Sequence, residues 1–220
     1  MNTETMLSVL VGIGLSAACG FRIFVPMLVM SVASLSGHLT LSPGFEWIGT
    51  YPALLAFAVA TVLEIAAYYI PWVDHLLDVI ASPAAVVAGI IAMASTVTGT
   101  SPFLRWSLAI IAGGGLAGTV QALTGLARVT SAATTGGLGN PVVSTFEAAG
   151  SITLSALAIL IPLAAAAAIV AILMLFYWPG RKLLRGLRSQ KGERRGNGGE
   201  TGSDRRKANS VNRYEKNGLQ

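Results

Sequence analysis

Cysteine and histidine are nearly absent from this sequence: Cys19 is the single cysteine, and the two histidines are His38 and His75. One cysteine cannot form an internal disulfide framework, and it cannot make a metal site by itself. No cluster of His, Cys and carboxylate residues has the spacing of a recognised metal site. The sequence therefore excludes a disulfide scaffold, assigns no metal and leads us to expect no cofactor.

Motifs of the common enzyme classes are also missing. The sequence contains no G-x-S-x-G elbow, Walker loop or zincin pattern. The glycines of Gly12-x-Gly14 and Gly113-Gly114-Gly115 do not form dinucleotide-binding loops, because apolar helix surrounds them and no strand precedes them. We expect no enzyme activity, and an unrecognised membrane enzyme stays open as an alternative.

Charge is scarce and unevenly placed. Only 11% of the 220 residues are charged, whereas an ordinary soluble domain has roughly 25%, and 53% are hydrophobic. Residues 1–180 hold three basic and six acidic residues, a net charge of −3, and residues 181–220 hold twelve basic and four acidic residues, a net charge of +8. We therefore divide the chain into a transmembrane domain, 1–180, and a basic tail, 181–220.

Long apolar runs dominate the first part. A membrane-crossing helix needs about 20 mainly apolar residues, and five runs qualify: Met6–Ser36, Pro52–Ile70, Leu76–Val97, Phe103–Ala127 and Ala148–Trp178. The runs are continuous and lack the alternating segments of an outer-membrane barrel. We predict an all-α polytopic bundle of about five helices, with six left open. Arg22 and Pro26 interrupt the first run, and the length of the last implies tilt or a bend at Pro162.

The tail begins with basic residues that we predict to be a membrane-surface anchor: Arg181, Lys182, Arg185 and Arg188. Basic residues at the end of a membrane helix favour the cytoplasmic side, and Tyr177-Trp178 suit the aromatic belt. After about Gln190 the composition predicts disorder. We expect a multi-pass protein of the cell (inner) membrane with a cytoplasmic C-terminus, whose tail contacts anionic lipid head groups rather than nucleic acid.

Five crossings and an internal C-terminus place the N-terminus outside. Residues 71–75 and 128–147 then also lie outside, and residues 38–51 and 98–102 lie inside. In either orientation, one group of charged residues falls toward a single membrane face: Glu64, Asp74, Asp78, Arg128 and Glu147.

Ionisable side chains at membrane depth are the main functional signal. Such groups are costly in hydrocarbon and usually face the bundle interior, pair with one another, or line a wet cavity. Our candidates for a cavity or ion pathway are Arg22, Glu64, Asp74, Asp78, Arg128 and Glu147. The structural alternative is that Arg22 pairs with Glu64, and Arg128 with Glu147, as clips between helices.

Asp74 and Asp78 are four residues apart and share one helical face. Two carboxylates so placed could bind a hard cation. Both also lie near a helix start, where acidic residues suit the positive end of the helix dipole. The helix-start explanation is the better supported of the two.

Small residues recur in the apolar runs, notably in Gly113–Gly118 and Ala164–Ala168. Small residues let helix backbones approach closely in lipid, so we interpret them as packing faces, with an open pathway as the alternative. Val11–Ala17 and Ala112–Gly118 are also similar to each other. If that similarity is a repeat, the two copies have opposite orientations, a pattern of secondary transporters.

Three segments resemble a known family: Gly14-Leu15-Ser16-Ala17-Ala18-Cys19-Gly20-Phe21-Arg22-Ile23-Phe24-Val25-Pro26; Glu64 with Ile70-Pro71-Trp72-Val73-Asp74-His75-Leu76-Leu77-Asp78; and Asn140-Pro141-Val142-Val143-Ser144-Thr145-Phe146-Glu147. They resemble the bacterial membrane-protein family numbered 4126 in the series of domains of unknown function. The resemblance covers residues 6–178 and departs at Tyr68, Tyr69 and Ala148, where the family pattern has charged residues. It implies a helical membrane fold and no particular activity.

The preferred hypothesis is a permease or channel for a small cation or solute, with the intramembrane acids around a polar cavity. The alternative is a membrane scaffold or assembly factor, with structural ion pairs and a tail that binds lipid or a partner. The expected partners are the lipid bilayer, anionic head groups and a small cation or solute, and self-association is left open.

Overall fold

The computed structural model describes residues 2–175, except for the side chains of residues 71–79. All regular elements of this part are helical. They are α1 (Thr3–Cys19), α2 (Phe24–Leu35), the short 3-10 helix η1 (Glu46–Gly49), α3 (Tyr51–Ala67), α4 (Pro71–Thr96), α5 (Pro102–Leu108), the π-helix η2 (Ala109–Gly114), α6 (Gly115–Thr135) and α7 (Asn140–Leu160). A further apolar helix spans Pro162–Leu175. The prediction of an all-α fold is confirmed for these residues.

One compact unit extends from Met1 to Ala171, and a second begins at Ile172. The division proposed at residue 180 and the predicted anchor residues of the tail lie outside the described residues. Two runs, Pro102–Thr135 and Asn140–Leu160, are long and apolar enough to cross a membrane by length and composition. The predicted set of five crossings is therefore not confirmed.

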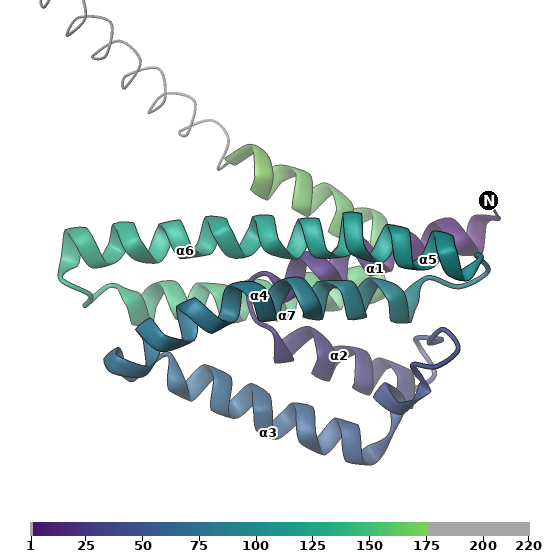
Figure 1. The fold of residues 1–220 in the computed structure, drawn as a ribbon, viewed down its shortest axis with the longest axis horizontal. Helices are drawn as coiled ribbons and strands as arrows, with labels where there is room; N and C mark the ends of the chain where they lie inside the picture. Colours follow the sequence, from purple (N-terminus) through teal and green to yellow (C-terminus); the bar gives the residue numbers. More distant parts are fainter. Residues whose placement is uncertain (1, 176–220) are drawn as a thin grey trace, which may run out of the picture. The chain divides into compact units, whose positions relative to one another are not determined.

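The first predicted run is divided into two helices that run in opposite directions (Figure 1). α1 ends at Cys19, α2 begins at Phe24, and a turn at residues 20–23 joins them. Gly20 permits this turn to lie close to α6, because a Cβ on Gly20 would lie 2.6 Å from the Ala117 carbonyl oxygen. The α1–α2 hairpin thus holds Arg22 at its tip.

The hairpin brings the start of α1 to the same end of the unit as the α4–α5 connection. The Thr98 N–H donates to Ser8 Oγ at 3.3 Å. After α2, the Ser42 N–H donates to the Ser95 carbonyl at 2.7 Å, at the end of α4. The predicted separation of the N-terminus from residues 38–51 and 98–102 is therefore wrong, since α1 and α2 enter and leave at one end.

The last predicted run is interrupted at Pro162, which confirms the predicted bend. α7 ends at Leu160, and the next helix begins at Pro162. Proline has no N–H to donate and its ring crowds the preceding turn, so it commonly starts a new helix.

Glycines pack α4 directly against the π-helix η2. A Cβ on Gly113 would lie 2.6 Å from the Gly89 carbonyl oxygen, and one on Gly114 would lie 3.0 Å from the Ile90 side chain. The interpretation of these glycines as packing residues is confirmed at both positions. This contact holds α4 against the run Pro102–Thr135 (Figure 1).

Candidate functional site

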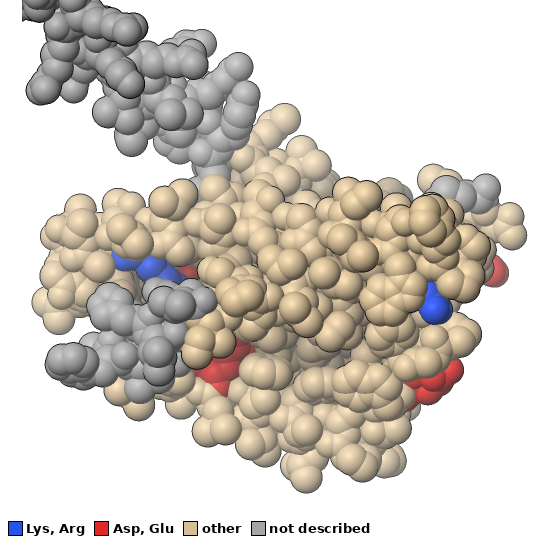
Figure 2. Space-filling view, in the orientation of Figure 1, with Lys and Arg blue, Asp and Glu red and all other residues tan. Residues whose placement is uncertain are grey.

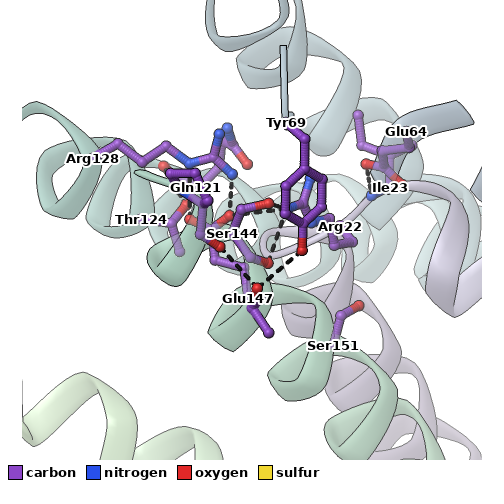
Figure 3. Close-up of polar contacts among 12 residues, drawn as sticks. Arg22, Ile23, Glu64, Tyr69, Gln121, Thr124, Arg128, Ser144, Glu147 and Ser151 are labelled. Atoms are coloured by element: carbon purple, nitrogen blue, oxygen red, sulfur yellow. Dashed lines mark hydrogen bonds and ion pairs between the residues drawn. The ribbon is translucent and has the colours of Figure 1, made fainter. Parts of the chain in front are cut away.

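Three charged side chains from distant parts of the sequence meet inside the unit (Figure 3). Arg128 of α6 donates from Nε to Glu147 Oε1 of α7 at 3.0 Å, and its Nη2 donates to Glu147 Oε2. Arg22, at the hairpin tip, places Nη2 3.6 Å from the same Oε2 atom. Glu147 therefore neutralises part of the charge of two arginines. All three side chains are buried.

Arg22 is held by α7 and is only partly satisfied. Its Nη2 donates to the Ser144 carbonyl at 3.0 Å and to Ser144 Oγ. Arg22 is 1% exposed, and its Nε and Nη1 atoms have no hydrogen-bond partner among the described residues. Buried donors are normally paired, so these two guanidinium nitrogens are an exception within the described part of the chain.

Tyr68 places its ring against both arginines. The Arg22 Cζ atom lies 3.9 Å from the ring centroid, and the Arg128 Cζ atom lies 4.0 Å from it. A guanidinium over an aromatic ring is attracted by the ring quadrupole. Tyr68 follows α3 directly, so it links α3 to the charges of α6 and the hairpin.

Replacing Tyr68 by Leu should lower the free energy of unfolding by about 2 kcal/mol, because both cation–π contacts are lost. Tyr68→Phe keeps the ring and should keep most of this stability. Detergent-denaturation midpoints of the purified variants measure the difference. Equal losses for Phe and Leu would show that the ring is not the source of the stabilisation.

Glu64 of α3 binds the start of α2. Its Oε1 accepts the Ile23 N–H at 2.8 Å, and its Oε2 accepts the Phe24 N–H at 3.0 Å. The first N–H groups of a helix have no partner within the helix, and a carboxylate there satisfies them. The predicted Arg22–Glu64 pair is therefore wrong, since Arg22 pairs with Glu147, whereas the predicted Arg128–Glu147 pair is confirmed.

Two cavities lie between α3, α4 and the start of α2, and Glu64 lines the larger of them. The larger, of about 540 Å³, is lined by Glu64, Tyr68 and mainly apolar residues. The smaller, of about 420 Å³, is lined by residues such as Met27, Trp47 and Phe57. Arg22, Arg128 and Glu147 line neither cavity. Of the predicted cavity residues whose side chains the structure describes, Glu64 alone lines a cavity, the larger one, and the walls of both cavities are mainly apolar.

Comparison with protein-family models decides the relationship of the chain. One model matches residues 9–182. The chain belongs to the family described as Domain of unknown function (DUF4126). No curated protein and no solved structure matches it. The matched range contains Arg22, Glu64, Arg128 and Glu147, so the resemblance seen in the sequence is confirmed.

The remaining predicted site residues of this DUF4126 chain are the pair Asp74 and Asp78 and the basic anchor of the tail. The backbone of Asp74 and Asp78 lies in α4, but their side chains lie outside the described residues, as does the anchor Arg181, Lys182, Arg185 and Arg188. Among the described residues, no group of three His, Cys, Asp or Glu could hold a metal ion.

Tyr68 and Ser144 also belong to the site, and neither was predicted from the sequence. Tyr68 lies four residues after Glu64, and Ser144 lies three residues before Glu147. Residues three or four apart share a helical face. This spacing is the feature of the sequence that could have placed Tyr68 beside Glu64 and Ser144 beside Glu147.

Proposed function

We propose that this protein is an integral membrane protein. The distribution of side chains supports this: large apolar residues such as Leu63, Ile111 and Leu160 are exposed, whereas Arg22 and Glu147 are buried. Uncharged side chains cover most of the face seen in Figure 2. Soluble proteins rarely expose large contiguous apolar surfaces, and ionisable groups in membrane helices face the bundle interior.

Within the membrane, we propose that it is a permease or channel for a small solute or cation. The observation that carries this proposal is the hairpin tip: α1 and α2 break inside the unit at Arg22, next to Glu64 and a cavity. Transporters commonly build their sites where helices are interrupted, because unwound backbone and helix ends are then available to a solute. Glu64 is the residue proposed to meet the solute.

A membrane scaffold is the second candidate function. The observation that favours it is the direct pairing of Arg22, Arg128 and Glu147. Buried ion pairs can hold helices in register without any solute. In this case the basic tail, 181–220, would bind lipid or a partner.

Liposomes containing the purified chain should show cation or proton flux above that of empty vesicles. Glu64→Gln should reduce this flux to the level of empty vesicles, because the carboxylate that meets the solute is lost. Glu4→Gln is the matched control, since Glu4 is exposed. Fluorescent indicators inside the vesicles measure the flux.

Truncation after Gly180 separates the two candidates. A transporter should retain its flux without the tail, whereas a scaffold should lose its binding to anionic vesicles. Absence of flux for every cation in a panel, with the protein correctly inserted, would overturn the transport proposal and favour the scaffold.

A further inference from the structure

Among the described residues that line the larger cavity, Glu64 is the acidic one, and the others are apolar except for Tyr68. Glu64 lines it together with Ala60, Leu63, Ile80 and Ala84, among others. The smaller cavity shares Ile23, Phe24, Ile80 and Ala84 with it, so the two adjoin. Small-molecule sites typically have volumes of about 300–1,000 Å³, mostly apolar walls and few polar groups. Both cavities have this character.

Glu64 has capacity to bind a further group. Its two hydrogen bonds come from uncharged backbone N–H groups, and it makes no ion pair with a described residue. A carboxylate oxygen has two lone pairs, so each oxygen retains one acceptor position. The nearby guanidinium groups of Arg22 and Arg128 are directed to Glu147 and Tyr68 instead.

Charge complementarity indicates what would occupy the cavity. A buried carboxylate in apolar surroundings is stabilised by a positively charged partner. An anion would be repelled by Glu64, and a strongly hydrated metal ion would find no further carboxylate among the lining residues that the structure describes. A cation with apolar substituents can pair its charge with the Glu64 carboxylate and place its substituents against the apolar lining residues.

The rim of the cavity favours the same class of ligand. Leu63 is 63% exposed and Ile80 is 58% exposed, so apolar side chains flank the cavity at the outer surface of α3 and α4. In a bilayer, a ligand that enters past these residues must partition into hydrocarbon.

We propose that the cavity beside Glu64 binds hydrophobic organic cations, with the positive group at the Glu64 carboxylate and the apolar substituents against α3 and α4. The inference rests on the proposed transport function and names its substrate class. It assigns Glu64 the recognition of charge and Ala84, in the wall of both cavities, the recognition of apolar volume.

Binding of tetraphenylphosphonium to the purified full-length protein in detergent tests this proposal. We expect saturable binding by equilibrium dialysis. Glu64→Gln should weaken it at least about tenfold, because one partner of a desolvated charge pair is removed. Ala84→Leu should weaken it similarly by filling the cavity, and Glu4→Gln should leave it unchanged.

A neutral probe of similar shape, triphenylphosphine oxide, separates charge from apolar volume. Its binding should be weaker than that of the cation, and it should be insensitive to Glu64→Gln and sensitive to Ala84→Leu. The proposal is overturned if the cation shows no saturable binding, if Glu64→Gln binds it like the native chain, or if the neutral probe binds equally well. Should Glu64→Gln fail to fold, Ala84→Leu and the neutral probe decide the matter.

The outcomes for binding and for transport are distinguishable. Binding of the cation without flux in liposomes would support the proposed binding site and overturn the proposed permease or channel function. Flux of another solute without binding of tetraphenylphosphonium would retain transport and overturn the assignment of substrate class.

Discussion

Replacing Glu147 by Gln should lower the free energy of unfolding by about 3–5 kcal/mol, because removing one partner of a buried ion pair leaves the other charge uncompensated. Here one carboxylate serves two arginines: Arg128 binds both of its oxygens, and Arg22 lies 3.6 Å from one of them. Equilibrium unfolding in mixed detergent micelles measures the change. We expect this substitution to be among the most damaging in the described part of the chain.

The double variant Arg128→Gln and Glu147→Gln tests whether the loss comes from the pair. Removing both charges should cost less than the sum of the single substitutions, with a coupling energy of about 0.5–3 kcal/mol. Recovery should be incomplete, because Arg22 still lacks its counter-charge. Glu4→Gln, at an exposed position, should change stability by less than about 0.5 kcal/mol. Strict additivity of the two single changes would contradict the proposed pairing.

The positions of the helices could largely be predicted from hydropathy, but their directions could not. The apolar run Met6–Ser36 was recognised with its interruptions at Arg22 and Pro26. In the structure the chain turns back at residues 20–23, so the run does not cross as one helix. Hydropathy measures how much apolar length is available, and it is the same whether a segment continues or reverses. The predicted topology of the N-terminus failed for this reason.

The candidate site was partly predictable because charge at membrane depth is visible in a sequence. Arg128 and Glu147 were expected to pair, and they do. The partner of Arg22 was predicted wrongly, because depth along a helix does not determine the direction in which a side chain points. Glu64 illustrates the same limit: its carboxylate binds the backbone at the start of α2, a partner that leaves no mark in the pattern of side chains.

The break in the first run and the charge cluster depend on each other. The turn at residues 20–23 places Arg22 beside Ser144 and Glu147, and it frees the N–H groups of Ile23 and Phe24 that Glu64 accepts. A change at Glu64 therefore acts on both the cavity and the start of α2. For this reason Ala84→Leu, which leaves Glu64 intact, is the cleaner probe of the cavity.

Gly113→Leu should prevent close packing of α4 against η2 and lower the free energy of unfolding by about 3 kcal/mol, the upper part of the usual range for overpacking. Even a Cβ at this position would lie 2.6 Å from the Gly89 carbonyl oxygen and 2.7 Å from Met93 Cβ. The obstructing atoms are close to the backbone, so a rotamer change cannot relieve the clash. The two helices must separate.

Gly115→Leu is the matched control for Gly113→Leu. The two glycines are two residues apart, and a Cβ on Gly115 would have no neighbour within 4 Å. Leucine is a better helix former than glycine by up to about 1 kcal/mol, so Gly115→Leu should leave stability unchanged or raise it. Unfolding midpoints of the two variants in the same detergent give the comparison. Equal stability of the two would show that the close contact between Gly113 and Gly89 does not hold α4 in place, because only Gly113 faces another helix.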